Sequence, residues 1–293
     1  MKALIILMWL LHWLPLPILG RLGAVLGFLL YFIMKPRRHI TLTNLRLCFP
    51  DKSEAEREII ARQHFQAYAR SALERGVLWW ASEARLRRLI RIEPHVPLEM
   101  IKSSPTILLC PHFVCLEIPG IALVLNSDLS VCTLYSRQQN VVIDRALLKG
   151  RSRFRPVTLL SREKGIKPII RAMRAGLPFI MLPDMDFGLR DAEFVPFFGV
   201  PAATLTATAR IAAATQANVI PMTTTFLPNY QGWKTTFYPA WENYPGDDIS
   251  LAARRMNAFI EQRVLEAPAE YFWAHKRFKT RPAGAPDVYG IND

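Results

Sequence analysis

The chain has 293 residues, enough for one well-buried α/β domain with a terminal extension and short for two full domains. Hydrophobic residues make up 51% of it, which excludes a disordered chain and is high for a soluble enzyme. The formal net charge of +13 implies an anionic partner, either nucleic acid, an anionic membrane or a phosphorylated substrate.

The first long segment, 3–34, contains a single charged residue, Arg21, and basic residues follow it at 35–38. It is longer than one helix needs to cross about 30 Å of hydrocarbon. Two prolines interrupt it, Pro15 and Pro17. A bent segment embedded in one leaflet is therefore as plausible as a full crossing. We predict that residues 1–38 form a membrane anchor and that residues 39–293 form one domain, which the basic flank keeps on the cytoplasmic side.

The remainder alternates between helical patterns and short apolar runs. Residues 51–95 are predicted to be helical, with Asp51 or Ser53 as the N-cap. The predicted strands are 106–110, 131–135, 157–160, 179–182, 218–226 and 233–238. The predicted later helices are 164–175, 202–216 and 248–266. This alternation is typical of an α/β fold with a mostly parallel sheet flanked by helices.

The four cysteines form no CxxC pair and have no zinc-ligand spacing. We therefore expect free, buried thiols in a reducing compartment and no metal. The four are Cys48, Cys110, Cys115 and Cys132. An acyl-carrying nucleophile is one interpretation of Cys115, but a small buried hydrophobic residue is the favoured interpretation.

The strongest candidate for catalysis is His112, which follows the predicted strand 106–110. Ligands of open α/β sheets bind outside the carboxyl ends of the strands, and histidine suits proton transfer near neutral pH. Glu117 lies five residues on, where it could orient the His112 ring and stabilise its imidazolium. The expected number of chance H-x4-[D/E] matches in such a chain is roughly 0.5. The position of His112 after a strand therefore carries the argument.

Here the sequence resembles a known family. The H-x4-E segment 111–117 resembles the motif that holds the catalytic base in the lysophospholipid acyltransferase superfamily. Residues 183–204 contain the runs P-D-M-D-F-G, F-V-P-F-F-G and A-A-T, and resemble the corresponding block of the late acyltransferases of lipid A biosynthesis. The resemblance implies no cofactor or metal, and a role for Asp184 and Asp186 in supporting the site or contacting the substrate.

Further segments of the same resemblance cover nearly the whole chain. They are N-L-x-x-C-F-P at 44–50, Tyr135-Ser136-Arg137 with Asn140, Gly150-Arg151 and the ending 271–282. Ser136 departs from the family's pattern, Y-R-P-x-x-N. The residues assigned to substrate binding are Arg137, Arg151, Asp184, Asp186 and Arg281.

The implied reaction is transfer of a fatty acyl chain from acyl carrier protein to a hydroxyl of a phosphorylated lipid A precursor, with His112 as general base. Residues 39–293 would then be the acyltransferase domain, at the inner membrane and facing the cytoplasm. The stretch 137–174 carries 11 Lys/Arg against two acids, and we expect it, with the basic end 276–281, to bind acceptor phosphates or the acidic carrier.

Two alternatives remain open. The acceptor could be another glycolipid or a lysophospholipid, or the protein could be a non-catalytic, membrane-tethered protein that binds anionic lipid. Nucleic acid is disfavoured because the basic stretch lacks a recognisable binding motif. His275 could be a second titrating group, although packing or phosphate contact is the more common role of such a residue.

Overall fold

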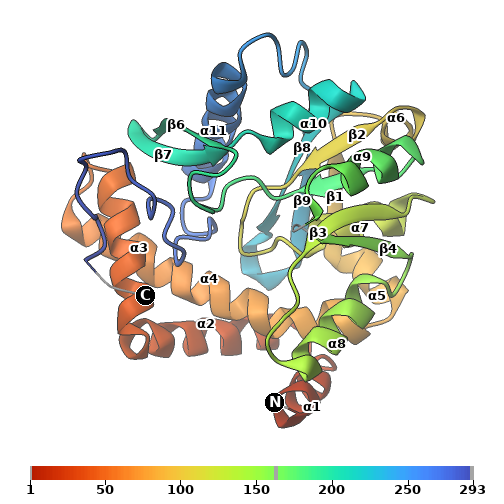
Figure 1. Cartoon of the computed structure of the whole chain (residues 1–293). Helices are drawn as coiled ribbons and strands as arrows, with labels where there is room; N and C mark the ends of the chain where they lie inside the picture. Colours follow the sequence, from red (N-terminus) through yellow and green to blue (C-terminus); the bar gives the residue numbers. More distant parts are fainter. Residues whose placement is uncertain (1, 162–163, 291–293) are drawn as a thin grey trace.

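The computed structural model describes residues 2–161 and 164–290, and a seven-stranded sheet forms its centre (Figure 1). The strand order is β1-β9-β8-β2-β5-β3-β4. These strands are β1 (Ile90–Pro94), β2 (Thr106–Leu109), β3 (Val131–Tyr135), β4 (Val157–Ser161), β5 (Phe179–Met181), β8 (Asn218–Phe226) and β9 (Trp233–Phe237). Every neighbouring pair is parallel except β8 and β9. The predicted α/β fold with a mostly parallel sheet is confirmed.

Helices surround the sheet (Figure 1). The N-terminal ones are α1 (Lys2–Leu11), α2 (Leu16–Ile33), α3 (Lys35–Cys48), α4 (Glu54–Trp80) and α5 (Glu83–Leu89), of which α2 and α4 lie below the sheet in the view of Figure 1. The others are α6 (Leu98–Ser103), α7 (Ile118–Asn126), α8 (Val141–Arg151), α9 (Lys167–Arg174), α10 (Ala207–Thr215) and α11 (Ile249–Glu266), with a short 3₁₀ turn, η2 (Pro228–Tyr230). Of the two predicted caps for α4, Ser53 is the one used, and it forms a capping box with Glu56.

Two sequence-based helix predictions extend too far. The predicted helix 51–95 breaks at residues 81–82, where Ser82 caps α5, and residues 90–94 form β1, which pairs with β9. The predicted helix 202–216 begins only at Ala207, because residues 200–205 form strand β7. Strand β1 pairs with β9, which is distant in sequence, and residues 200–205 pair with a segment that was not predicted to be a strand. In both places tertiary pairing overrides the local preference.

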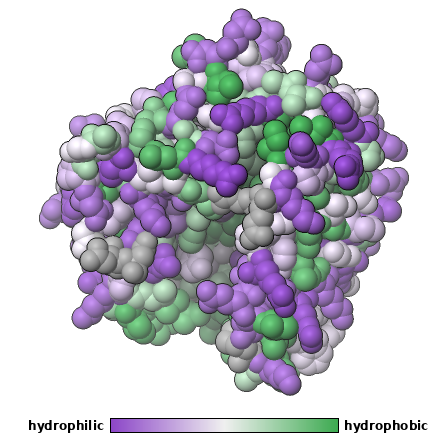
Figure 2. Space-filling view, in the orientation of Figure 1, coloured by the Kyte–Doolittle hydropathy of each residue, from purple (hydrophilic) through white to green (hydrophobic). Residues whose placement is uncertain are grey.

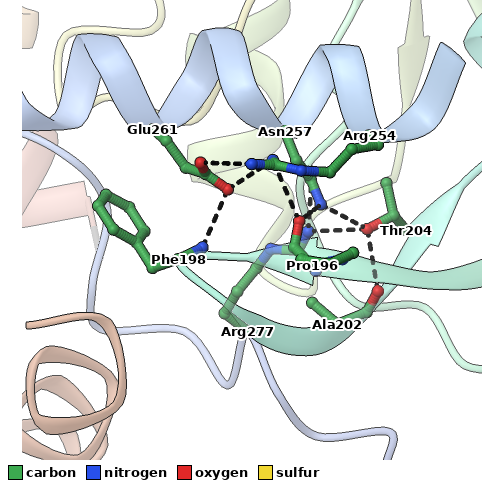
Figure 3. A network of polar contacts seen from close by, with 8 residues as sticks. All are labelled: Pro196, Phe198, Ala202, Thr204, Arg254, Asn257, Glu261 and Arg277. Carbon is green, nitrogen blue, oxygen red and sulfur yellow. Dashed lines mark hydrogen bonds and ion pairs between the residues drawn. The ribbon is translucent and has the colours of Figure 1, made fainter. Parts of the chain in front are cut away.

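Strand β7 (Val200–Leu205) pairs with β6 (Ala192–Phe197) in a separate antiparallel hairpin. Its two turn residues, Phe198 and Gly199, both have positive φ, as a tight hairpin turn requires. The guanidinium of Arg277, which is fully buried, donates to the Ala203 carbonyl and to Thr204 in this hairpin. Figure 3 shows how Arg277, α11 and the hairpin share one network of polar contacts.

From α11, Asn257 donates to the Pro196 carbonyl and to Thr204, while Glu261 accepts from the Phe198 amide and pairs with Arg254 (Figure 3). The network therefore fixes the hairpin and the C-terminal segment to the same helix.

All four cysteines are free and buried, as predicted. Of the helices in the described part of the chain, α2 is the one long and apolar enough to cross a membrane, with a mean hydropathy of 1.9.

Candidate active site

A histidine and an aspartate meet at the carboxyl ends of two adjacent strands. Strands β2 and β5 are parallel neighbours in which Leu109 is opposite Met181. Each strand is followed by one residue and then a proline, Pro111 or Pro183, which cannot donate to a sheet hydrogen bond. The next residues are His112 and Asp184, three positions beyond the paired ones. The two side chains therefore leave the sheet side by side.

The contact between them is close and has several hydrogen bonds. His112 Nδ1 lies 2.7 Å from Asp184 Oδ1. The backbone amide of His112 also donates to the same carboxylate, at 3.1 and 3.0 Å from its two oxygens. Asp184 is fully buried, whereas the His112 side chain is 16% exposed. An ionised carboxylate on Nδ1 selects the tautomer with the proton on Nδ1, so Nε2 is left as the basic nitrogen.

Electrostatics keep Asp184 ionised. Burial by itself raises the pKa of this carboxyl, but the charge and hydrogen bonds of His112, with a contribution from His275, lower the pKa to about 2. Asp184 is therefore a carboxylate throughout the physiological pH range and can stabilise a protonated His112 during a reaction.

The C-terminal segment holds the backbone around His112. The Phe272 amide donates to the His112 carbonyl at 2.8 Å, and the Val114 amide donates to the Glu270 carbonyl at 2.8 Å. Phe113 forms a bridge with Tyr271 between these bonds. Residues 271–282, which resemble the ending of the family's sequences, therefore have a structural role, because they fix the loop that carries His112.

The N-terminal part of the domain holds that segment in turn. Asn44, from the N-L-x-x-C-F-P run, donates to the carbonyls of Trp273 and His275, both at 2.8 Å. His275 is buried, and its Nδ1 lies 2.5 Å from the Phe272 carbonyl. Burial lowers the pKa of His275 to about 4, so it is neutral near pH 7. These contacts favour packing over proton transfer as the role of His275.

Glu117 occupies a different place from the one expected. Its carboxylate is bound by Arg151, with Nε–Oε2 at 2.9 Å and Nη2–Oε1 at 2.5 Å. Burial alone would raise the pKa of Glu117, but the Arg151 hydrogen bonds and charge lower it. The carboxylate on the His112 ring is that of Asp184, so the predicted orienting contact from Glu117 is replaced. The reason is geometric: residues 113–117 turn into α7 and carry Glu117 toward α8.

A mostly apolar cavity is lined by residues that follow His112 and precede Asp184 in sequence, although neither His112 nor Asp184 is itself in its lining. It lies between α7 and strands β3, β4 and β5, and Glu117, Arg151 and Thr133 form its polar part. Leu116 and Leu182, which line it, are close in sequence to His112 and Asp184 respectively. The apolar lining consists of Leu116, Gly120, Ile121, Val124, Val131, Val157, Ile180 and Leu182. Figure 2 shows that the face of the molecule seen in Figure 1 is hollowed near its centre, with hydrophilic residues around the rim.

The other predicted substrate-binding residues are scattered. Arg137 is exposed in the segment before α8. Asp186 accepts from the amide and hydroxyl of Thr280, both at 2.7 Å, and so anchors the C-terminal segment. Arg281 donates to the Pro201 carbonyl in the hairpin. The structure therefore brings His112 together with Asp184, and Arg151 with Glu117, but it does not gather all of these residues at one point.

The basic stretch 137–174 is not one uniform surface either. Arg151 is engaged by Glu117, Arg153 donates to the carbonyl of Leu78, and Arg155 pairs with Asp128. Arg162 lies outside the described residues. Fewer of these cations are available to a ligand than the sequence count suggested.

Chemically, a histidine with a buried carboxylate on Nδ1 is a base–orienter pair that can accept a proton at Nε2. Cys115 does not provide a nucleophile, because it is buried and burial raises the pKa of its thiol well above the usual value.

Two features were missed from sequence: the orienting role of Asp184 and the Glu117–Arg151 ion pair. The matching positions of His112 and Asp184 after two buried strands are a signal that could have revealed the first.

Comparisons with known proteins identify the family of this chain. Residues 2–280 match the family model described as bacterial lipid A biosynthesis acyltransferase. The chain is 33% identical over 294 residues to the lipid A biosynthesis lauroyltransferase of Escherichia coli (strain K12), covering 96% of this chain and 92% of that protein. It is 36% identical over 290 residues to the myristoyltransferase of the same organism, covering 94% and 84%. The palmitoleoyltransferase of that organism is 29% identical over 285 residues, with coverage of 96% and 92%. The chain is an acyltransferase that belongs to the bacterial lipid A biosynthesis acyltransferase family.

Proposed function

We propose that this enzyme transfers a fatty acyl chain from acyl carrier protein to a hydroxyl of a phosphorylated lipid A precursor, at the cytoplasmic side of the inner membrane. The observation that carries the proposal is the His112–Asp184 pair, in a chain of the lipid A acyltransferase family that has a mostly apolar cavity lined by the nearby residues Leu116 and Leu182. The cavity suits an acyl chain, and the pair suits activation of a hydroxyl.

In the proposed reaction, His112 Nε2 takes the proton of the acceptor hydroxyl as its oxygen attacks the thioester carbonyl carbon. The tetrahedral intermediate collapses when the carbon–sulfur bond breaks, and the protonated His112 returns a proton to the departing thiolate. Asp184 keeps the ring oriented and stabilises the imidazolium between these steps. The products are an ester on the lipid and a free thiol on the carrier.

Arg151 is the proposed donor to the developing oxyanion. It lines the cavity, and its ion pair with Glu117 uses Nε and Nη2. Within the described residues no hydrogen bond engages its Nη1. A fixed positive group in a largely apolar cavity stabilises negative charge more strongly than it would in water. Glu117 would then act as a positioning residue that holds the guanidinium.

Disruption of this ion pair gives a prediction that separates its structural and catalytic parts. Arg151→Met leaves Glu117 buried without a counter-charge, and we expect a loss of about 3–5 kcal/mol in the free energy of unfolding, together with a large loss of transfer. The double variant Arg151→Met/Glu117→Gln removes both charges and should recover most of the stability.

The double variant should nevertheless remain poorly active if Arg151 stabilises the oxyanion. Thermal unfolding in detergent and steady-state transfer rates, measured on the same preparations, test this. Recovery of transfer together with stability would show that Arg151 acts only as a structural partner of Glu117.

Acyl-chain selection gives a second prediction. The relatives named above differ in the chain that their names specify, so the family alone does not fix it. Gly120 lies on α7 in the cavity wall, and a Cβ there would meet Ile180 Cδ1 at 3.4 Å. A larger side chain at residue 120 should therefore fill the cavity.

We expect Gly120→Leu to shift preference toward acyl donors shorter by several carbons, because their terminal methylenes no longer fit. Competition between acyl carrier protein loaded with chains of different length measures the ratio of kcat/KM. The control is Leu265→Ala, whose side chain is exposed on α11. A second glycine, Gly165, is less suitable for a control substitution to leucine because its backbone has positive φ. An unchanged chain profile in a folded, active Gly120→Leu enzyme would place the acyl chain elsewhere.

The direct test of function is mass spectrometry of lipid A from cells with and without this protein. The proposal predicts that lipid A from cells lacking it is lighter by one acyl group. Purified protein should add that group in vitro from acyl carrier protein. If the lipid A is unchanged while a phospholipid or another glycolipid loses an acyl chain, the acceptor has been misassigned.

A further inference from the structure

We infer that helices α1 and α2 lie in the outer part of a single leaflet, along the membrane surface, and that neither crosses the bilayer. This extends the membrane attachment included in the proposed function and specifies its geometry. Of the two arrangements that the sequence left open, it selects the segment embedded in one leaflet over the full crossing.

The first observation is that α2 is joined to the folded domain along most of its length. A Cβ on Gly23 would lie 2.5 Å from the Cα of Arg70 on α4, and one on Gly27 would collide with the backbone at Phe65. Such glycines allow two helix backbones to approach closely. Near the end of α2, the Tyr31 hydroxyl donates to Glu58. One side of α2 is therefore packed against α4 over several turns.

The second observation is that α4 cannot enter hydrocarbon together with α2. Arg70, whose backbone lies against Gly23 in the middle of α2, forms an ion pair with Glu74. Next to Tyr31 near the end of α2, Glu58 and Arg62 form a second ion pair in which each side chain is 45% exposed. A charge at the centre of a bilayer costs roughly 2.5–3.5 kcal/mol or more. If α2 crossed the membrane, the α4 surface packed against it would occupy the same depth. The domain would have to leave α2 or carry its charges into the membrane.

The third observation is that the opposite sides of α1 and α2 are exposed and apolar. The large exposed apolar side chains there are Leu4, Ile6, Leu7, Trp9, Leu10, Trp13, Ile18, Leu22, Val25, Leu26, Phe28, Leu29, Phe32 and Ile33. An apolar surface of this extent marks an interaction site. A helix with one packed side and one apolar side is suited to lie in the interfacial plane.

Charge and aromatic content identify lipid as the occupant. Residues 1–50 contain no acidic residue, whereas Lys2, Arg21, Lys35, Arg37 and Arg38 border or interrupt the apolar segment. These cations complement anionic lipid head groups. A second copy of the chain would bring the same cations face to face. The exposed tryptophans, Trp9 and Trp13, are also typical of the membrane–water interface.

Depth measurements test the inference on the full-length protein reconstituted in vesicles of phosphatidylethanolamine and phosphatidylglycerol. Single cysteines replace Ile18, Val25 and Ile33, which are exposed along α2, and are spin-labelled; the four native cysteines are buried. We expect the three labels to lie at similar depth, within about 5 Å, as for an interfacial helix.

A crossing helix gives a different profile. Because each α-helical residue rises about 1.5 Å, Val25 would lie near the bilayer centre with the other two labels roughly 10 Å shallower on opposite sides. That profile would overturn the inference, as would three labels in water. A second measurement uses Lys2→Cys and Lys35→Cys with an impermeant maleimide. Labelling of both from the cytoplasmic side supports the inference, and labelling of Lys2→Cys from the periplasmic side contradicts it.

The outcome is separable from the proposed reaction. Transfer of an acyl group to a lipid A precursor is assayed on the same labelled proteins. A crossing profile with normal transfer overturns the topology alone, and a flat profile without transfer by the unmodified protein overturns the proposed function alone.

Discussion

His112→Asn should reduce acyl transfer by about 10²- to 10⁴-fold, the usual contribution of a general base. Asparagine is chosen because its side-chain amide can donate to Asp184 in place of Nδ1, so the buried carboxylate keeps a partner. His112→Ala would remove that partner and could lower stability as well as activity. The asparagine variant therefore isolates the loss of the basic nitrogen.

Steady-state transfer from acyl carrier protein to a lipid A precursor measures the effect, with thermal unfolding as the check on folding. We expect the loss in kcat with little change in the melting temperature. A folded His112→Asn enzyme that retains transfer within a few-fold of normal would show that another group removes the hydroxyl proton.

Asp184→Asn should produce a loss of similar size, again about 10²- to 10⁴-fold. An amide at residue 184 can donate to Nδ1 and so favour the wrong tautomer of His112, with its proton on Nε2. It also removes the negative charge that stabilises the imidazolium. Since the pKa of Asp184 is about 2, this residue itself should not titrate in an assay between about pH 5 and 9.

Asp186→Asn is the matched control, because it makes the same change two residues away. Asp186 binds Thr280 rather than His112, so we expect a lower melting temperature with kcat reduced far less than in Asp184→Asn. Equal losses of kcat in the two variants, each folded at the assay temperature, would contradict the distinct roles that the hydrogen bonds indicate.

Several of the family's motifs have a structural role, as their contacts indicate. Asn44 holds the backbone at residues 273–275, and residues 270–272 hold the loop around His112. Arg277 is buried against the β6–β7 hairpin, as Figure 3 shows. Segments far apart in sequence thus form one frame around the His112–Asp184 pair. Such positional accuracy is required because proton transfer demands hydrogen-bond distances.

Much of the fold could be predicted from local sequence. Strand 131–135 was predicted with its observed bounds, and strand 218–226 likewise, because β-branched and apolar runs bounded by turn residues identify buried strands. His112 could be singled out for the same reason, since its position after a buried strand follows from the chain itself. The family was also recognisable from its motifs.

Only the tertiary structure decided which partners these residues have. Strand β1 and the β6–β7 hairpin depend on pairings that local propensity does not reveal, and so residues 90–94 and 202–205 were assigned to helices. Glu117 lies closer to His112 in sequence, yet Asp184, 72 residues away, takes the contact. The order of strands in the sheet places β5 beside β2, and that order arises from packing of the whole chain rather than from any local segment.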